Sequence, residues 1–205
     1  MEALIIVDVQ YDFLPGGALA VAGGDVIINP INQLIPQFEL VVATQDWHPK
    51  DHGSFASNHP GMNPGETISL NGLQQILWPD HCVQDTTGAE FDQNLHLPGI
   101  SRIFQKGTDP SIDSYSGFFD NGHLKATGLG DYLSDRGVEG VNIVGLATDY
   151  CVKFTALDAV DLGYRTAVIA DATRAANLNP SDYELAILEM DKKGIRIGQS
   201  TDWLG

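Results

Sequence analysis

Short apolar runs separated by polar loops recur along this chain and constrain its fold more than any other feature. The first, ALIIVDV, is apolar almost throughout, as in a strand whose two faces are both covered. Strands are expected at residues 3–9, 40–44, 101–105, 141–146, 166–170 and 195–197, and helices at 25–35, 124–136, 148–162 and 180–193. This alternation predicts right-handed βαβ units, and therefore an α/β fold with a mainly parallel sheet. No repeat or linker interrupts it, so residues 1–205 are expected to form a single domain.

The charge and the cysteine content argue against several classes of protein. The net charge of −16 argues against binding to nucleic acid or to anionic membranes, but not against a neutral small-molecule substrate. Two cysteines provide no disulfide framework, which favours a reducing compartment. The N-terminal residues are not those of a signal peptide, and no apolar run approaches the roughly 20 residues of a membrane helix. We therefore expect a cytoplasmic protein, either a monomer or a small homo-oligomer.

The segment VNIVGLATDYCVKFT, residues 141–155, predicts a strand, a sharp turn at Gly145 and a helix. Thr148 or Asp149 is placed to be the N-cap, which puts Cys151 in the first helical turn. The free amides and the dipole of that turn favour an anion, so the thiol is expected to ionise more readily than a free one. This arrangement indicates a nucleophile beside an oxyanion site. For a lone cysteine, a buried structural role is the commoner alternative.

Four polar residues lie where predicted strands end: Asp8, Asp46, Lys106 and Cys151. Parallel strands present their carboxyl ends at one edge of the sheet, so these side chains are expected to converge there. Asp8 can accept the thiol proton of Cys151 and later return it, while Lys106 orients and stabilises the charges. Taken singly, the aspartate could cap a loop and the lysine could be a surface charge. Convergence at one edge favours catalysis.

A second group consists of Asp46, His48 and His81, with His52 or Ser54 as further candidates. Residues two apart on a strand end point the same way, and one carboxylate with two imidazoles suits zinc, iron or manganese. Four of the six histidines fall within residues 48–81, although a hydrogen-bonded histidine in a polar loop is the usual alternative.

The stretch from residue 49 to residue 90 is a long polar insertion, and such loops usually carry function. Cys82 follows His81 directly, and adjacent residues in extended chain face opposite ways, so Cys82 is expected to pack in the interior. Aromatic side chains close to the strand ends could form a flat pocket for a ring, or could equally belong to the core. They are Phe13, Trp47, Trp78 and Tyr115.

Taken together, six motifs resemble the corresponding segments of the bacterial nicotinamidases, which belong to the isochorismatase-like cysteine hydrolases. In chain order they are IIVDVQYDF, GGALAV, TQDWHPKDHGSFA, WPDHCVQ, KGTDPSIDSYSGFFDN and GLATDYCVKFTALDA. The resemblance runs from the first expected strand to the last. It implies a three-layer α/β fold, with a six-stranded, mainly parallel sheet flanked by helices.

The resemblance also implies roles for individual residues. Cys151 corresponds to the nucleophile, Asp8 to the acid and base, and Lys106 to the third member of a catalytic triad. The peptide bond between Leu146 and Ala147 corresponds to one that is cis in the family. In that family it directs the amides at the positions of Ala147 and Cys151 toward the oxyanion.

By the same resemblance, Asp46, His48 and His81 correspond to ligands of one divalent metal ion, zinc, iron or manganese. The remaining ligand position varies within the family, so the resemblance does not decide whether His52 or Ser54 is a metal ligand.

The activity that the resemblance implies is hydrolysis of nicotinamide to nicotinate and ammonia through a thioester, in NAD salvage. Phe13, Trp78 and Tyr115 correspond to a ring pocket, and the metal would hold the pyridine nitrogen so that the carboxamide lies over the nucleophile. Pyrazinamide, which has a similar shape, should also be accepted. Two alternatives are a related amidohydrolase that acts on a carbamoyl or ureido compound without metal, and a non-catalytic metal-binding or ligand-binding protein of the same fold.

Overall fold

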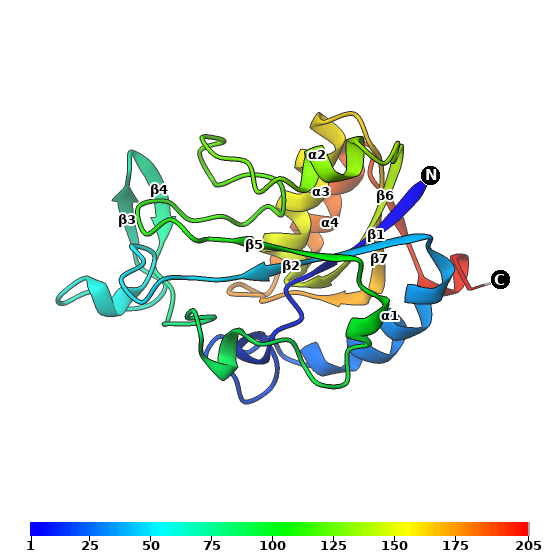
Figure 1. Ribbon diagram of the computed structural model, residues 1–205. Coiled ribbons are helices and arrows are strands. Elements are labelled where there is room, and N and C mark those ends of the chain that lie inside the picture. Colours follow the sequence, from blue (N-terminus) through cyan, green and yellow to red (C-terminus); the bar gives the residue numbers. More distant parts are fainter. Residues whose placement is uncertain (205) are drawn as a thin grey trace.

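The computed structural model describes residues 1–204, and its centre is a six-stranded sheet in the order β5-β2-β1-β6-β7-β8 (Figure 1). Every neighbouring pair in this sheet is parallel. The strands are β1 (Glu2–Val7), β2 (Leu40–Asp46), β5 (Arg102–Lys106), β6 (Gly140–Leu146), β7 (Arg165–Arg174) and β8 (Arg196–Gly198). The six expected strands and their parallel pairing are thus confirmed.

Helices cover both faces of the sheet and produce three layers (Figure 1). On one face, α1 (Ile28–Leu34) packs against the sheet together with residues near both ends of the chain. On the other face lie α2 (Leu129–Ser134), α3 (Lys153–Asp161) and α4 (Asp182–Lys192). In β1, Leu4 and Ile6 point into the first layer, whereas Ala3, Ile5 and Val7 point into the second. This two-sided burial explains why the run is continuously apolar.

The chain reverses its direction of travel across the sheet at β1. It proceeds outward from β1 through β2 to β5, and then returns to the other side of β1 for β6, β7 and β8. A crevice forms outside the carboxyl ends of the strands at such a switch point, which is where α/β proteins bind their ligands. The ends of β1, β2 and β6 therefore define the place to look for a site.

The expected helices are present but differ in extent. The helix expected at 124–136 is confined to α2, because Asp120 accepts bonds from the amides of Gly122 and Leu124 and holds the chain before α2 in turns. Asp25 does not cap α1, which is preceded by a 3-10 turn at Gly24–Ile27. Within residues 1–204, no helix combines the length and the apolar character that a membrane crossing requires.

The insertion of residues 49–90 contains an antiparallel hairpin that is separate from the main sheet (Figure 1). Its strands are β3 (Thr67–Leu70) and β4 (Leu73–Ile76). Asn71 and Gly72 connect them with positive φ angles of 49° and 82°, as a two-residue hairpin turn requires. The Asn-Gly dipeptide between two short alternating segments was the sequence signal for this hairpin, which was missed.

Candidate active site and metal centre

The four polar residues expected at the strand ends do meet at one edge of the sheet. Asp8 follows β1, Asp46 ends β2, Lys106 ends β5 and Cys151 follows β6, and all four are at most 7% exposed. Asp46 and Lys106 are register partners in the pairing of β2 with β5. Oxygen atoms of both aspartates and the sulfur of Cys151 lie within 4.8 Å of one another. The predicted convergence is therefore correct.

Lys106 lies at the centre of this cluster. Its Nζ donates hydrogen bonds to Asp46 Oδ1 at 2.5 Å, to the carbonyl of Ser114 at 2.9 Å and to Cys151 Sγ at 3.4 Å, and it lies 3.0 Å from Asp8 Oδ2. Burial alone would lower the pKa of Lys106, but the two carboxylates raise it well above its ordinary value. The amine is therefore a cation, and it joins the two groups predicted from the sequence.

The two oxygens of the Asp8 carboxyl group have different surroundings. Oδ1 accepts a hydrogen bond of 2.7 Å from Thr44 Oγ1. Oδ2 is buried and forms an ion pair with Lys106 Nζ at 3.0 Å, but it accepts no hydrogen bond within the described residues. Burial raises the pKa of Asp8, although the Lys106 ammonium opposes this shift. A buried carboxylate oxygen of raised basicity beside a thiol can accept a proton.

Cys151 lies in a π-helical turn, Thr148–Val152, that joins β6 to α3. The predicted N-cap is wrong: Thr148 Oγ1 pairs with Thr173 Oγ1 at 2.9 Å, and Asp149 accepts bonds of 2.8 Å from the amides of Ala176 and Asn177. Thr148 thus joins the turn to the end of β7, and Asp149 joins it to the segment after β7. Sequence spacing could not show either contact.

The prediction of an easily ionised thiol is also wrong for this resting arrangement. Burial raises the pKa of Cys151 well above its ordinary value, and Asp8 and Asp46 act in the same direction while Lys106 opposes them. The group is therefore a thiol that needs a base. The peptide bond from Leu146 to Ala147 is cis, as the resemblance implied.

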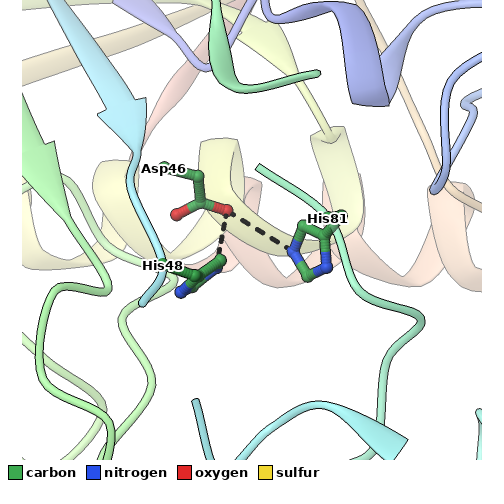
Figure 2. A group of neighbouring side chains, drawn as sticks. All are labelled: Asp46, His48 and His81. Carbon is green, nitrogen blue, oxygen red and sulfur yellow. Dashed lines mark ion pairs between the residues drawn. The ribbon is translucent and has the colours of Figure 1, made fainter. Parts of the chain in front are cut away.

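The predicted metal ligands gather around one oxygen of Asp46 (Figure 2). Asp46 Oδ2 lies 3.4 Å from His48 Nε2 and 3.8 Å from His81 Nε2. The other ring nitrogen of each histidine faces a carbonyl: His48 Nδ1 is 2.9 Å from Gly107 O, and His81 Nδ1 is 2.8 Å from Pro79 O. These contacts fix the hydrogen on Nδ1 and leave the lone pair on Nε2, which is the usual second shell of a metal-binding histidine. One carboxylate oxygen and two such nitrogens fit a divalent ion.

Gly107 is required for this geometry. With φ at +63° it follows β5, and a Cβ atom there would lie 2.3 Å from His48 Cε1 and 2.6 Å from Nδ1. The backbone therefore approaches the imidazole more closely than any other residue would allow.

The two further ligand candidates bind each other. His52 Nδ1 lies 2.7 Å from Ser54 Oγ, both residues are fully buried, and the rings of His52 and His48 are 4.4 Å apart. Burial lowers the pKa of His52 to about 4, so the ring is neutral. Cys82 packs in the core on the α1 side of the sheet, as expected.

Both groups contribute residues to one cavity that is partly open to solvent. Asp46, His81, Ala147 and Cys151 contribute to its wall, and the remaining lining residues are mostly aromatic or aliphatic. The predicted ring-pocket residues Phe13, Trp78 and Tyr115 are among them, together with Leu19, Val21, Asp113, Tyr150 and Ala176.

An aromatic wall of Trp78, Tyr115 and Tyr150 bounds this cavity. The ring of Tyr150 makes edge contacts with Trp78 and Tyr115 at 5.1 and 5.6 Å, and Trp78 Nε1 donates to Tyr115 Oη at 3.2 Å. Sequence reasoning missed Tyr150, although its position beside Cys151 was a signal. Trp47 does not line the cavity but packs against the core on the α1 side.

Comparisons with known proteins agree with this geometry. The sequence matches the Isochorismatase domain over residues 2–202. It is 48% identical to the nicotinamidase of Escherichia coli (strain K12) over 206 residues, which cover 98% of this chain and 96% of that protein.

Two solved structures share the fold at substantial identity. An Acinetobacter baumanii nicotinamidase and pyrazinamidase superposes with a TM-score of 0.95 at 52% identity, covering 98% of this chain and 97% of its own. The pyrazinamidase of Pyrococcus horikoshii in complex with zinc superposes with a TM-score of 0.79 at 42% identity, covering 97% of this chain and 98% of its own. The fold and the resemblance expected from the sequence are thus confirmed.

Proposed function

This chain belongs to the isochorismatase domain family, and we propose that it is an amidohydrolase that converts nicotinamide to nicotinate and ammonia. One observation carries the proposal: the buried group of Cys151, Asp8 and Lys106 and the carboxylate-histidine group meet at one aromatic cavity. A cavity with aromatic and aliphatic walls and a few polar groups suits a single aromatic ring that carries a carboxamide. Pyrazinamide, which differs from nicotinamide by one ring nitrogen, is a second substrate.

The nucleophile is Cys151, and its base is Asp8. Oδ2 of Asp8 takes the thiol proton, because Oδ1 accepts from Thr44 Oγ1 whereas Oδ2 accepts no hydrogen bond within the described residues. The sulfur then forms a bond to the carboxamide carbon, and the carbonyl π electrons move to oxygen. Lys106 remains protonated throughout and stabilises the negative charge on sulfur before attack and on Asp8 after it returns the proton.

The tetrahedral oxyanion is stabilised by the main-chain amides of Ala147 and Cys151, both of which belong to residues that line the cavity. Asp8 returns its proton to the nitrogen as the carbon–nitrogen bond breaks, which releases ammonia and leaves a thioester. A water molecule, deprotonated by Asp8, then cleaves the thioester to nicotinate and restores the thiol. Each proton that Asp8 accepts is thus given back within one turnover.

Asp46, His48 and His81 would hold one divalent ion, and zinc, iron and manganese all suit this mixture of one oxygen and two nitrogen ligands. The zinc complex of the Pyrococcus horikoshii relative supports such an ion. When bound, the ion supplies a Lewis-acidic position for the pyridine nitrogen. His52 and Ser54 lie beside His48 as candidates for the remaining ligand position, directly or through water.

The ring of the substrate packs against Phe13, Trp78 and Tyr115, which orients the carboxamide toward Cys151. The partner of this protein is therefore a small molecule, and the reaction serves the salvage of NAD. A cytoplasmic location, no binding to nucleic acid or membranes, and a monomeric or small homo-oligomeric state complete the proposal.

The test is ammonia release from nicotinamide by the purified protein, before and after removal of metal with a chelator. Release that falls on chelation and returns with added zinc, iron or manganese supports both groups. A rate of ammonia release that chelation does not change would support a cysteine hydrolase whose mechanism does not use a metal. A folded, metal-loaded protein that releases no ammonia from nicotinamide but cleaves a carbamoyl or ureido compound would support the alternative amidohydrolase. Ammonia release from none of these compounds would support a non-catalytic binding protein.

A further inference from the structure

The side chain of Gln10 completes the hydrogen bonding of β2 at the residue where the catalytic and metal groups meet. The ladder between β1 and β2 ends with the pair Val7 and Thr44, and the chain then turns at Asp8, whose φ is +48°. The amide and carbonyl of Asp46 consequently have no strand partner on the β1 side. Gln10 supplies both: its Oε1 accepts from Asp46 N at 2.8 Å, and its Nε2 donates to Asp46 O at 2.8 Å.

Gln10 is itself held rigidly. It is fully buried, and its backbone forms an antiparallel bridge with Phe91. Flanking bonds join Tyr11 N to Glu90 O at 3.0 Å and Asp92 N to Val9 O at 3.1 Å. The second hydrogen of its Nε2 is donated to Ala89 O at 2.8 Å, so both amide hydrogens are used. Gln10 is therefore a rigid residue that binds both the amide and the carbonyl of Asp46.

The two carboxylate oxygens of Asp46, the residue that Gln10 holds, have different partners. Asp46 Oδ1 accepts from Lys106, and Oδ2 faces His48 and His81. A small shift of the Asp46 backbone would therefore move a ligand oxygen relative to both imidazoles. We propose that Gln10 is a positioning residue that fixes the metal-binding carboxylate of Asp46 by completing the sheet at the end of β2. This inference rests on the proposed role of Asp46 as a metal ligand.

The chain offers a matched control. Gln45 Nε2 donates to the same carbonyl, Ala89 O, at 2.9 Å, but the Gln45 side chain makes no hydrogen bond to Asp46 within the described residues. Gln10→Met and Gln45→Met therefore each remove one bond to Ala89 and replace an amide by a thioether of similar length. Only Gln10→Met also releases the backbone of Asp46.

The experiment measures metal binding by the full-length protein and both variants, each first freed of metal. Zinc affinity is obtained by competition with a chromophoric chelator, and Co²⁺ is used as a spectroscopic probe of ligand geometry. We expect Gln10→Met to weaken zinc binding by about 10- to 100-fold and to alter the visible Co²⁺ bands, as removal of a group that orients a metal ligand does. Gln45→Met should change the zinc affinity by no more than about twofold and leave those bands unchanged.

Thermal unfolding of the metal-free forms separates positioning from general stability. A substitution that only destabilises the fold would lower the midpoint of unfolding and leave the Co²⁺ bands unchanged. Equal zinc affinity and identical Co²⁺ spectra for the two variants would overturn the inference. If the unaltered protein binds no metal, the proposed role of Asp46 fails first, which is a distinct result. Should Gln10→Met not fold, Gln10→Asn, which keeps the amide but is one methylene shorter, carries the same expectation.

Discussion

The nucleophile group and the metal group share one edge of the sheet, but the fold builds them in different ways. Asp8, Lys106 and Cys151 each come from the end of a strand or the turn directly after it, so the sheet alone brings them together. In the metal group only Asp46 belongs to a strand. His48 and His81 lie in loops, and each imidazole depends on a backbone carbonyl of another residue for its orientation.

This difference means that the two groups should respond differently to substitution. A change at a strand end alters chemistry without displacing the backbone, whereas a change near the loops alters the position of a ligand. Asp46 is the exception, because its Oδ1 binds Lys106 and its Oδ2 belongs to the metal group. A substitution of Asp46 should therefore affect both the nucleophile group and the metal group, whereas a substitution of His81 should affect only the metal group.

The largest effect is expected from Cys151→Ala, which removes the nucleophile and leaves the metal group intact. Turnover of nicotinamide should fall on the order of 10⁵- to 10⁶-fold, since the loss of a covalent nucleophile costs about this much. Metal content measured by atomic emission should equal that of the unaltered protein. Retained turnover would refute the covalent mechanism. Loss of metal would show that metal binding depends on the side chain of Cys151.

Asp46→Ala and His81→Ala compare the shared ligand with an unshared one. Both should lose bound metal and raise the KM for nicotinamide, with losses in kcat/KM of about 100-fold or more. Only Asp46→Ala should also change Cys151, because the Asp46 carboxylate helps to raise the pKa of that thiol. Its removal leaves the Lys106 cation less neutralised and should favour the thiolate.

The readout for Cys151 is the rate of alkylation by iodoacetamide at neutral pH in metal-free protein. Asp46→Ala should react faster than His81→Ala, because loss of the Asp46 carboxylate lowers the pKa of the Cys151 thiol and leaves more of it ionised at neutral pH. Equal rates in the two variants would mean that the Asp46 carboxylate does not raise the pKa of the Cys151 thiol.

Gly107→Ala tests how tightly the loop ligand His48 is held. The added methyl group would occupy the space of the imidazole, so the ring must move away from Asp46. Metal affinity should fall by about 10- to 100-fold, as it does when a group that orients a ligand is lost. Gly137→Ala is the control, because Gly137 also has a positive φ but nothing lies near the position of its Cβ. Similar metal affinities for the two variants would exclude a direct effect on His48.

The smallest effect is expected in the aromatic wall. Tyr115→Phe removes the hydroxyl that accepts from Trp78 Nε1 and leaves that donor without this partner. The cost of about 1 kcal/mol should raise the KM for nicotinamide by about fivefold and leave kcat nearly unchanged. A fall in kcat with an unchanged KM would instead place Tyr115 in the chemical step.

Much of the fold could be predicted, because the signals are local. Each buried strand is an apolar run, and the alternation of strands with helices predicts a parallel sheet. The residues at the strand ends could be identified for the same reason. The strand order, with its reversal at β1, came only from the structure. The helix starts were less predictable: the side chains of Thr148 and Asp149, which seemed suited to capping, bind the end of β7 and the segment after it instead.

The sequence by itself determined that strands alternate with helices and that Asp8, Asp46, Lys106 and Cys151 come at strand ends. A continuous apolar run is a property of neighbouring residues and can be identified without knowledge of its tertiary contacts. Only the tertiary structure decided the ionisation of Cys151, the bond from Lys106 to Asp46 and the grip of Gln10 on Asp46. These depend on burial and on contacts across 36 to 60 residues of chain, and the free energies of such contacts are set by three-dimensional proximity.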